Sequence, residues 1–190
     1  MQTVRRHILL AACVAVTACL GASAAIAQES GGNGGISPSD PAYKPASRAT
    51  IVDGKAVPPP GAPPEVVAAI NAANAIVTKP YRYGGGHKSF DDSGYDCSGS
   101  ISYALRGANL LTSPLDSSGF MRWGKRGRGR WITVYTNPGH AYVMIAGRRL
   151  DTGGRSRTAA RSAGVAPGSG PRWGGRRSTR GYVARHPAGL

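Results

Sequence analysis

Apolar side chains recur every three or four residues over 64–78, a spacing that predicts a helix with one apolar face. The residues on that face are Val66, Ile70, Ala73 and Val77. Pro80 follows, and proline ends a helix because it has no amide hydrogen to donate. A second helix is predicted over 97–106, where apolar residues again have helical spacing and Asp96 or Ser98 can cap the start.

The pattern then changes to one typical of strands. WITVY at 131–135 and HAYVMIA at 140–146 are rich in β-branched and aromatic residues, and Asn-Pro-Gly between them predicts a hairpin. A third short strand is predicted over 149–152, after a turn at Gly147, and a last one over 181–186. Helices followed by an antiparallel meander predict an α+β fold, with N-terminal helices packed on a small antiparallel sheet.

Two stretches between these elements are expected to be mostly loop. The first, 107–130, is polar and contains a short helix near Phe120. The second, 153–176, is rich in Gly, Arg and Ser, which favour irregular structure.

The N-terminus has the pattern of a secretory signal over 1–27. Two arginines precede an apolar stretch, and Ala25-Ile26-Ala27 supplies a small-x-small cleavage pattern. Residues 28–63 are rich in Gly, Pro, Ser and Ala and are predicted to be a flexible linker, which leaves 64–190 as the folded domain. The protein is therefore expected to be secreted or periplasmic. An alternative is a lipoprotein anchored through Cys19, because Val16-Thr17-Ala18-Cys19 resembles a lipobox.

Cleavage of the signal would leave Cys97 as the one cysteine of the mature chain. A lone thiol in an oxidising compartment has no partner for an internal disulfide, so it is either a small buried hydrophobe or a reactive group. Cys97 lies at the predicted start of a helix. The unpaired N–H groups there favour the thiolate and can also stabilise an oxyanion. The position favours a nucleophile.

A cysteine nucleophile needs a base, and the candidates are His87, His140 and His186. His140 follows a turn and opens a strand, where a sheet can fix the imidazole, whereas His87 lies in a glycine-rich loop. Asp151 is expected to orient His140 if the two strands joined at Gly147 are adjacent. His186 is the alternative for this third role.

Three motifs resemble the NlpC-type (NlpC/P60) papain-like cell-wall peptidases. They are YRYGGG at 81–86, GYDCSGS at 94–100 and GHAYVMI at 139–145. The resemblance implies a papain-like α+β fold and hydrolysis of peptide or isopeptide bonds in peptidoglycan stem peptides. It further implies Cys97 as nucleophile, His140 as base and Asp151 as the third polar residue. The substrate-binding positions that it implies are Tyr81, Asp96 and Ser98.

The chain departs from the family pattern in three places. The third position is more often histidine than the aspartate found here, although a carboxylate also orients an imidazole. The usual Pro-Gly-Asp-Leu segment is replaced by the basic run at 124–130 and Trp131. The tail after about 153 is longer than the common core needs. These differences bear on substrate preference more than on the chemistry.

The charge balance indicates the kind of partner. The formal net charge of +15 should attract polyanions, which for an exported protein are anionic wall polymers more than nucleic acid. The basic run at 124–130 lacks the interleaved aromatic residues of a single-strand binder. No metal or other cofactor is expected, since the histidines and carboxylates lack ligand spacing.

Two alternatives to a cysteine peptidase remain. The same fold and nucleophile suit an amidase or an acyltransferase. A basic wall-binding or effector module with an incidental thiol would need no catalysis at all.

Overall fold

The computed structural model describes residues 47–153 and 170–190, which lie within one compact unit, Asn33–Leu190. The predicted signal over 1–27, with Cys19, lies outside the described residues. Among the described residues, no helix is long and apolar enough to cross a membrane.

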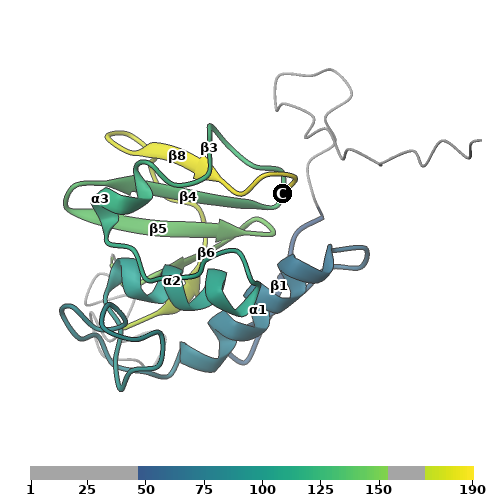
Figure 1. Cartoon of the computed structure of the whole chain (residues 1–190). Helices are drawn as coiled ribbons and strands as arrows, with labels where there is room; N and C mark the ends of the chain where they lie inside the picture. Colours follow the sequence, from purple (N-terminus) through teal and green to yellow (C-terminus); the bar gives the residue numbers. More distant parts are fainter. Residues whose placement is uncertain (1–46, 154–169) are drawn as a thin grey trace, which may run out of the picture. The chain divides into compact units, whose positions relative to one another are not determined.

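Two helices form one layer of the fold. Helix α1 (Pro64–Ile76) and helix α2 (Cys97–Gly107) pack against each other, and α2 also contacts the sheet (Figure 1). Both occur close to where the apolar spacing predicts them. The buried face of α1 is formed by Val66, Ala69, Ile70, Ala73 and Ile76. A short helix, α3 (Ser117–Phe120), buries Phe120 as expected.

The second layer is a six-stranded antiparallel sheet in the order β3-β8-β4-β5-β6-β7. Its strands are β3 (Lys125–Arg126), β4 (Ile132–Asn137), β5 (His140–Ile145), β6 (Arg148–Asp151), β7 (Arg172–Gly174) and β8 (Val183–His186). The β4–β5 hairpin and the adjacent β6 match the predicted meander. The described residues therefore have the predicted fold class, helices packed on an antiparallel sheet.

The two faces of the sheet have different surroundings. Ile132 and Val134 of β4 and Val143 and Ile145 of β5 are fully buried in the apolar core on the helical side. The residues that alternate with them project from the opposite face, because successive side chains of a strand point to opposite sides. These are Thr133, Tyr135, Tyr142 and Met144, and they line a cavity.

Two segments differ from the sequence prediction. Residues 47–63 were expected to belong to the linker, but they contain a hairpin of β1 (Thr50–Val52) and β2 (Lys55–Val57). Its turn residues, Asp53 and Gly54, both have positive φ, as a two-residue Asp-Gly hairpin turn requires. The loop predicted over 153–176 contains β7 near its end, while 154–169 lie outside the described residues.

One side chain joins the hairpin to both layers. Asn74 of α1 accepts hydrogen bonds from the Ala56 backbone N–H at 2.9 Å and from Trp173 Nε1 at 2.8 Å, and its amide donates to the Ala56 carbonyl at 2.8 Å. These bonds hold β2 and α1 against β7, the strand at one edge of the sheet. The N-terminal hairpin is thus part of the folded domain.

Candidate active site

Cys97 is the first residue of α2, and the chain before it is arranged to hold it there. Asp96 caps the helix, and its Oδ1 accepts a hydrogen bond from the Gly99 N–H at 2.8 Å. The Ser100 N–H bonds the Asp96 carbonyl at 3.0 Å. The N–H groups of Cys97 and Ser98 have no acceptor one turn earlier, as at the start of any helix. The half-buried thiol therefore lies beside backbone donors.

Glycines allow the loop at 84–86 to approach α2 closely. A side chain at Gly99 would collide with the carbonyl of Gly85, and one at Gly85 would collide with the carbonyl of Gly94. The Asp96 N–H bonds the Gly85 carbonyl at 3.3 Å across this contact. The glycines of the YRYGGG and DCSG motifs thus have a physical role: they bring the two segments together.

His140 is the first residue of β5, and Asp151 is the last residue of β6. The antiparallel pairing of these strands places the two side chains on the same face, and His140 Nε2 lies 2.9 Å from Asp151 Oδ1. An ionised carboxylate can only accept, so Nε2 carries the proton of this bond. The other ring nitrogen, Nδ1, is left to face Cys97.

The titration of His140 agrees with this arrangement. Its hydrogen bond to Asp151 and its interaction with Cys97 together raise the pKa of the imidazole to about 9, although burial opposes the shift. Both partners favour the charged form of the ring. At neutral pH the imidazolium is therefore the favoured state.

The pKa of the Cys97 thiol is lowered. Burial alone would raise it, but the interactions with the His140 side chain and with the Ala141 backbone N–H outweigh burial. A lowered thiol pKa next to a raised imidazole pKa is the condition for a thiolate–imidazolium pair. The geometry expected from sequence, a sulfur at a helix start facing a histidine on a strand, is present.

Asp151 has partners on both oxygens. Oδ1 also accepts from the Gly153 N–H at 2.9 Å, and Oδ2 accepts from Arg177 Nη1 at 2.9 Å. Arg149 Nε lies 3.5 Å from Oδ2, an ion-pair distance. Burial would raise the pKa of Asp151, but its bonds to His140, Gly153 and Arg177 lower it. The carboxylate therefore stays charged beside the imidazole.

His186, the alternative for the third role, lies elsewhere on the sheet. It is in β8, where its Nδ1 lies 3.1 Å from the Gly127 carbonyl oxygen. His87 also has a different partner, since its Nε2 lies 3.0 Å from Asp96 Oδ1 and 3.2 Å from Ser98 Oγ. Of the three histidines, His140 is therefore the one that contacts the thiol.

The three predicted substrate-binding residues surround Cys97 but differ in exposure. Tyr81 is 44% exposed, and its pKa is raised, first by burial and then by the negative charges of Cys97 and Asp96. Asp96 and Ser98 are nearly buried, at 7% and 3% exposure. Asp96 Oδ2 accepts one hydrogen bond, from the Gly84 N–H at 3.1 Å, so that oxygen can accept another.

Arg177 is a site residue that sequence reasoning missed. Besides bonding Asp151, its guanidinium lies over the rings of Tyr142 and Tyr182, 5.2 and 5.6 Å from the two centroids. It lies in the segment after β7, 26 residues beyond Asp151 along the chain. No motif marks it, because its role depends on where that segment folds back over the sheet.

No group of three or more histidine, cysteine or acidic side chains among the described residues could hold a metal ion. The histidine and carboxylate side chains near Cys97 form hydrogen bonds with one another instead: His87 with Asp96, and His140 with Asp151.

Comparison with known proteins gives matches among solved structures. No family model and no curated protein matches the chain. Peptidoglycan hydrolase RipB from Mycobacterium tuberculosis is 22% identical, with 68% of each chain covered and a TM-score of 0.46. A mutated form of the resuscitation promoting factor interacting protein RipA is 20% identical, covering 75% of this chain and 69% of that one, also at 0.46. An NlpC/P60 family protein from Bacillus cereus is 16% identical over 71% of this chain and 43% of that chain, at 0.46. The last of these is named for the family that the motifs around Cys97 and His140 resemble.

Proposed function

We propose that this chain is a cysteine peptidase of the NlpC/P60 type that hydrolyses peptide or isopeptide bonds in peptidoglycan stem peptides. The observation that supports this best is the alignment of three side chains: a half-buried thiol at a helix start, an imidazole in contact with it, and a carboxylate 2.9 Å from the second ring nitrogen. Three separate elements, α2, β5 and β6, supply them. An incidental thiol would need none of these partners.

In the proposed reaction, the Cys97 thiolate attacks the carbonyl carbon of the scissile amide. The N–H of Cys97 at the start of α2 stabilises the oxyanion, and the hydroxyl of Tyr81, which is 44% exposed, assists it. Protonated His140 then gives its proton to the leaving amine, and a thioester remains. His140 next takes a proton from water, the hydroxide attacks the thioester, and a carboxylic acid and the thiolate are released.

Substrate binding is proposed for the residues around the thiol. Tyr81 reaches solvent and can contact the peptide directly. Asp96 and Ser98 are nearly buried, so they would contact the substrate only at the wall of the site, where Asp96 Oδ2 can still accept a hydrogen bond from an ammonium group. Such a contact would favour a stem peptide with a free amine near the scissile bond.

The proposal also places the protein outside the cytoplasm, where its substrate lies. This rests on the signal pattern over 1–27, which lies outside the described residues. Detection of the mature N-terminus at Gln28 in secreted or periplasmic protein would support it. A protein labelled at Cys19 by a radioactive fatty acid would instead be a lipoprotein.

Digestion of purified muropeptides tests the activity directly. The wild-type chain should release new peptide fragments that mass spectrometry can assign, and Cys97→Ala should release none. His140→Ala should also be inactive, while His186→Ala is a matched control that changes a histidine away from the thiol and should keep activity. Cleavage between the sugar and the peptide would indicate an amidase instead. An unchanged digest with wild-type protein would contradict the proposal.

A further inference from the structure

A cavity of about 540 Å³ lies on the face of the sheet opposite α1 and α2. Four arginines contribute to its lining, Arg128, Arg130, Arg176 and Arg177, and among the described residues that line it none is acidic. Arg177 has Asp151 as a partner, but Arg128, Arg130 and Arg176 are exposed and make no ion pair within the described part of the chain. The cavity therefore carries a concentrated positive charge.

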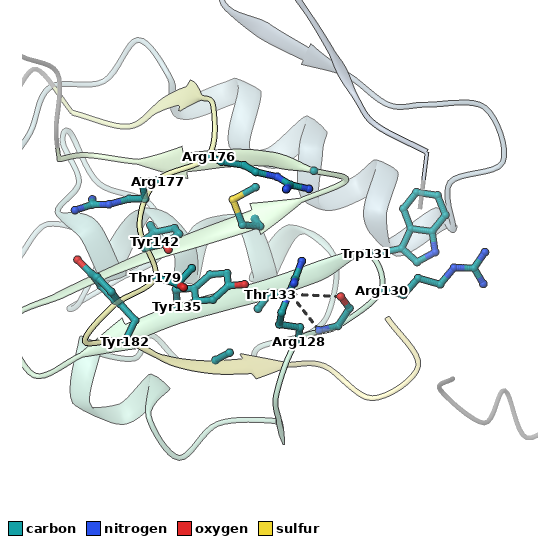
Figure 2. Close-up of a pocket in the computed structure, with 14 residues that line it drawn as sticks. Arg128, Arg130, Trp131, Thr133, Tyr135, Tyr142, Arg176, Arg177, Thr179 and Tyr182 are labelled. Carbon is teal, nitrogen blue, oxygen red and sulfur yellow. Dashed lines mark hydrogen bonds between the residues drawn. The ribbon is translucent and has the colours of Figure 1, made fainter. Parts of the chain in front are cut away.

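The arginines are spread along the cavity. Figure 2 shows Arg177 at one end, beside Tyr142 and Tyr182, and Arg130 at the other end, beside Trp131. Arg128 and Arg176 lie between them in this view. A single small anion would contact only part of this set. The spacing fits a ligand with several anionic groups along its length.

The tyrosines in the cavity have little ring surface left for a planar ligand. Tyr135 and Tyr142 stack on each other with centroids 5.1 Å apart, and Tyr182 meets Tyr142 edge-on at 5.2 Å. Arg177 covers the rings of Tyr142 and Tyr182. Sequence-tolerant binding of single-stranded nucleic acid relies on bases stacking on open aromatic rings. The cavity favours a ligand without bases.

Hydroxyl groups complete the lining. The Tyr142 hydroxyl is buried and has no hydrogen-bond partner among the described residues, and buried polar groups are normally satisfied. Thr179 and Tyr182 add two more hydroxyls at the same face. A ligand that brings its own hydroxyl or phosphate oxygens could satisfy these groups, whereas an apolar ligand could not.

We propose that this cavity binds a polymer of phosphodiester-linked sugar or polyol units. Arginine forms bidentate hydrogen bonds to phosphate oxygens, each phosphodiester keeps its charge at all physiological pH values, and the sugar or polyol units supply hydroxyls. Such a polymer would hold the enzyme on an anionic wall surface. The proposal concerns a cavity that Cys97, His140 and Asp151 do not line, and it does not depend on the proposed hydrolysis.

The test is a binding titration with a synthetic glycerol-phosphate oligomer of about six units, in which calorimetry measures the affinity. The double variant Arg128→Gln/Arg176→Gln removes two cavity charges that do not touch Asp151. A matched control, Lys55→Gln/Arg122→Gln, removes two exposed charges that do not line the cavity. We expect the cavity variant to bind about 10-fold or more weakly and the control to stay within about 2-fold of wild type. Thermal melting of each variant verifies that it is folded.

Three further arms decide the class of ligand. Inorganic phosphate, which offers one anion, should bind much more weakly than the oligomer. A polyglutamate peptide and a single-stranded oligonucleotide of equal charge should also bind more weakly. Equal losses in the two double variants, no binding of the oligomer, or equally tight binding of polyglutamate or the oligonucleotide would overturn the proposal. Since no arm measures hydrolysis, an inactive enzyme would leave the result unaffected.

Discussion

The carboxylate of Asp151 is almost completely buried, with its side chain 2% exposed. One oxygen bonds His140 and Gly153, and the other bonds Arg177. A buried carboxylate without partners would become protonated, but these bonds lower its pKa. Asp151 can therefore fix the imidazole and stabilise its charge at the same time.

Replacing Asp151 by asparagine should test this role. Asp151→Asn keeps the side-chain shape but removes the negative charge, and its amide can offer a donor instead of an acceptor to His140 Nε2. We expect kcat to fall by about 10²- to 10⁴-fold on muropeptides. His186→Ala is the control and should change kcat by less than about 2-fold. A larger loss of kcat in His186→Ala than in Asp151→Asn would indicate that His186, and not Asp151, orients the imidazole of His140.

The pH dependence of thiol labelling should report the pair formed by Cys97 and His140. The lowered pKa of Cys97 and the imidazole pKa of about 9 together define a range in which thiolate and imidazolium coexist. Iodoacetamide should label wild-type Cys97 readily at pH 7. In His140→Ala the thiol loses its positive partner, so its pKa rises and labelling slows. Equal labelling rates in the two proteins at pH 7 would show that Cys97 and His140 do not form a thiolate–imidazolium pair.

Turnover should depend on pH in a related way. Above about pH 9 His140 loses the proton that it gives to the leaving amine, so kcat/KM should fall on the alkaline side. On the acid side it should fall as the thiolate becomes protonated, below the ordinary thiol range because the Cys97 pKa is lowered. A profile that keeps rising beyond pH 10 would contradict the assignment of His140 as the acid.

Among the elements, α2 and the loop at 84–86 depend on each other for their position. Gly99 in the first turn of α2 lies against the Gly85 carbonyl, and no side chain fits between them. Gly99→Ala should therefore force the two segments apart and lower the free energy of unfolding by about 1–3 kcal/mol. Activity on muropeptides should fall by more than the loss of folded protein explains, because Cys97 moves with the start of α2.

Gly175→Ala is the matched control, because a side chain there would meet nothing within 4 Å. Denaturant unfolding should give a midpoint equal to or slightly above that of wild type for this variant. If Gly99→Ala unfolded at the wild-type midpoint as well, the close contact between α2 and the 84–86 loop would not be required for the fold.

Sequence patterns predicted the elements whose signals are local. Helical spacing located α1 and α2, and the Asn-Pro-Gly turn located the β4–β5 hairpin. The turn at Gly147 also implied that β6 lies beside β5, so the contact between His140 and Asp151 could be predicted. These inferences succeeded because each depended on neighbouring segments of the chain.

Features set by distant segments were missed. The strands β1, β2 and β7 have three residues each, too few to show a period, and β7 is held by the bond from Trp173 to Asn74, 99 positions away. The Asp53-Gly54 turn was a local signal for the first hairpin, but it was missed because it lies in a Gly- and Pro-rich region that indicated a linker. The position of β8 between β3 and β4, and that of Arg177 on Asp151, follow from long-range packing.

At the scale of the whole molecule, the proposed active site and the arginine-lined cavity share the central sheet. Tyr142 is paired opposite Tyr135 in the β4–β5 hairpin, whose second strand begins at His140, and Arg177 contacts both Tyr142 and Asp151. The cavity that we propose for anionic polymer therefore lies beside Asp151, the residue that we propose orients the imidazole of His140. Binding there would hold the wall close to the thiol.

The raised pKa of His140 also links the site to the stability of the fold. In the unfolded chain the imidazole has its ordinary pKa of 6.5, and in the folded chain the value is about 9. Folding thus favours the protonated ring, and this contribution is complete below about pH 6.5 and is lost as the pH rises through about 9. The main cause is Asp151, which stays in place when the thiol is removed.

Measurement of this contribution needs a protein without the thiol, because the titration of Cys97 would add a dependence of the opposite sign. We therefore compare Cys97→Ala with Cys97→Ala/His140→Gln by thermal melting at pH 6 and pH 10. The single variant should melt higher at pH 6, where its imidazolium pairs with Asp151. The difference should shrink markedly at pH 10, where the ring is neutral in both the folded and the unfolded chain. A difference that is the same at both pH values would mean that Asp151 does not stabilise the charged imidazole, and the proposed role of the buried carboxylate would then be wrong.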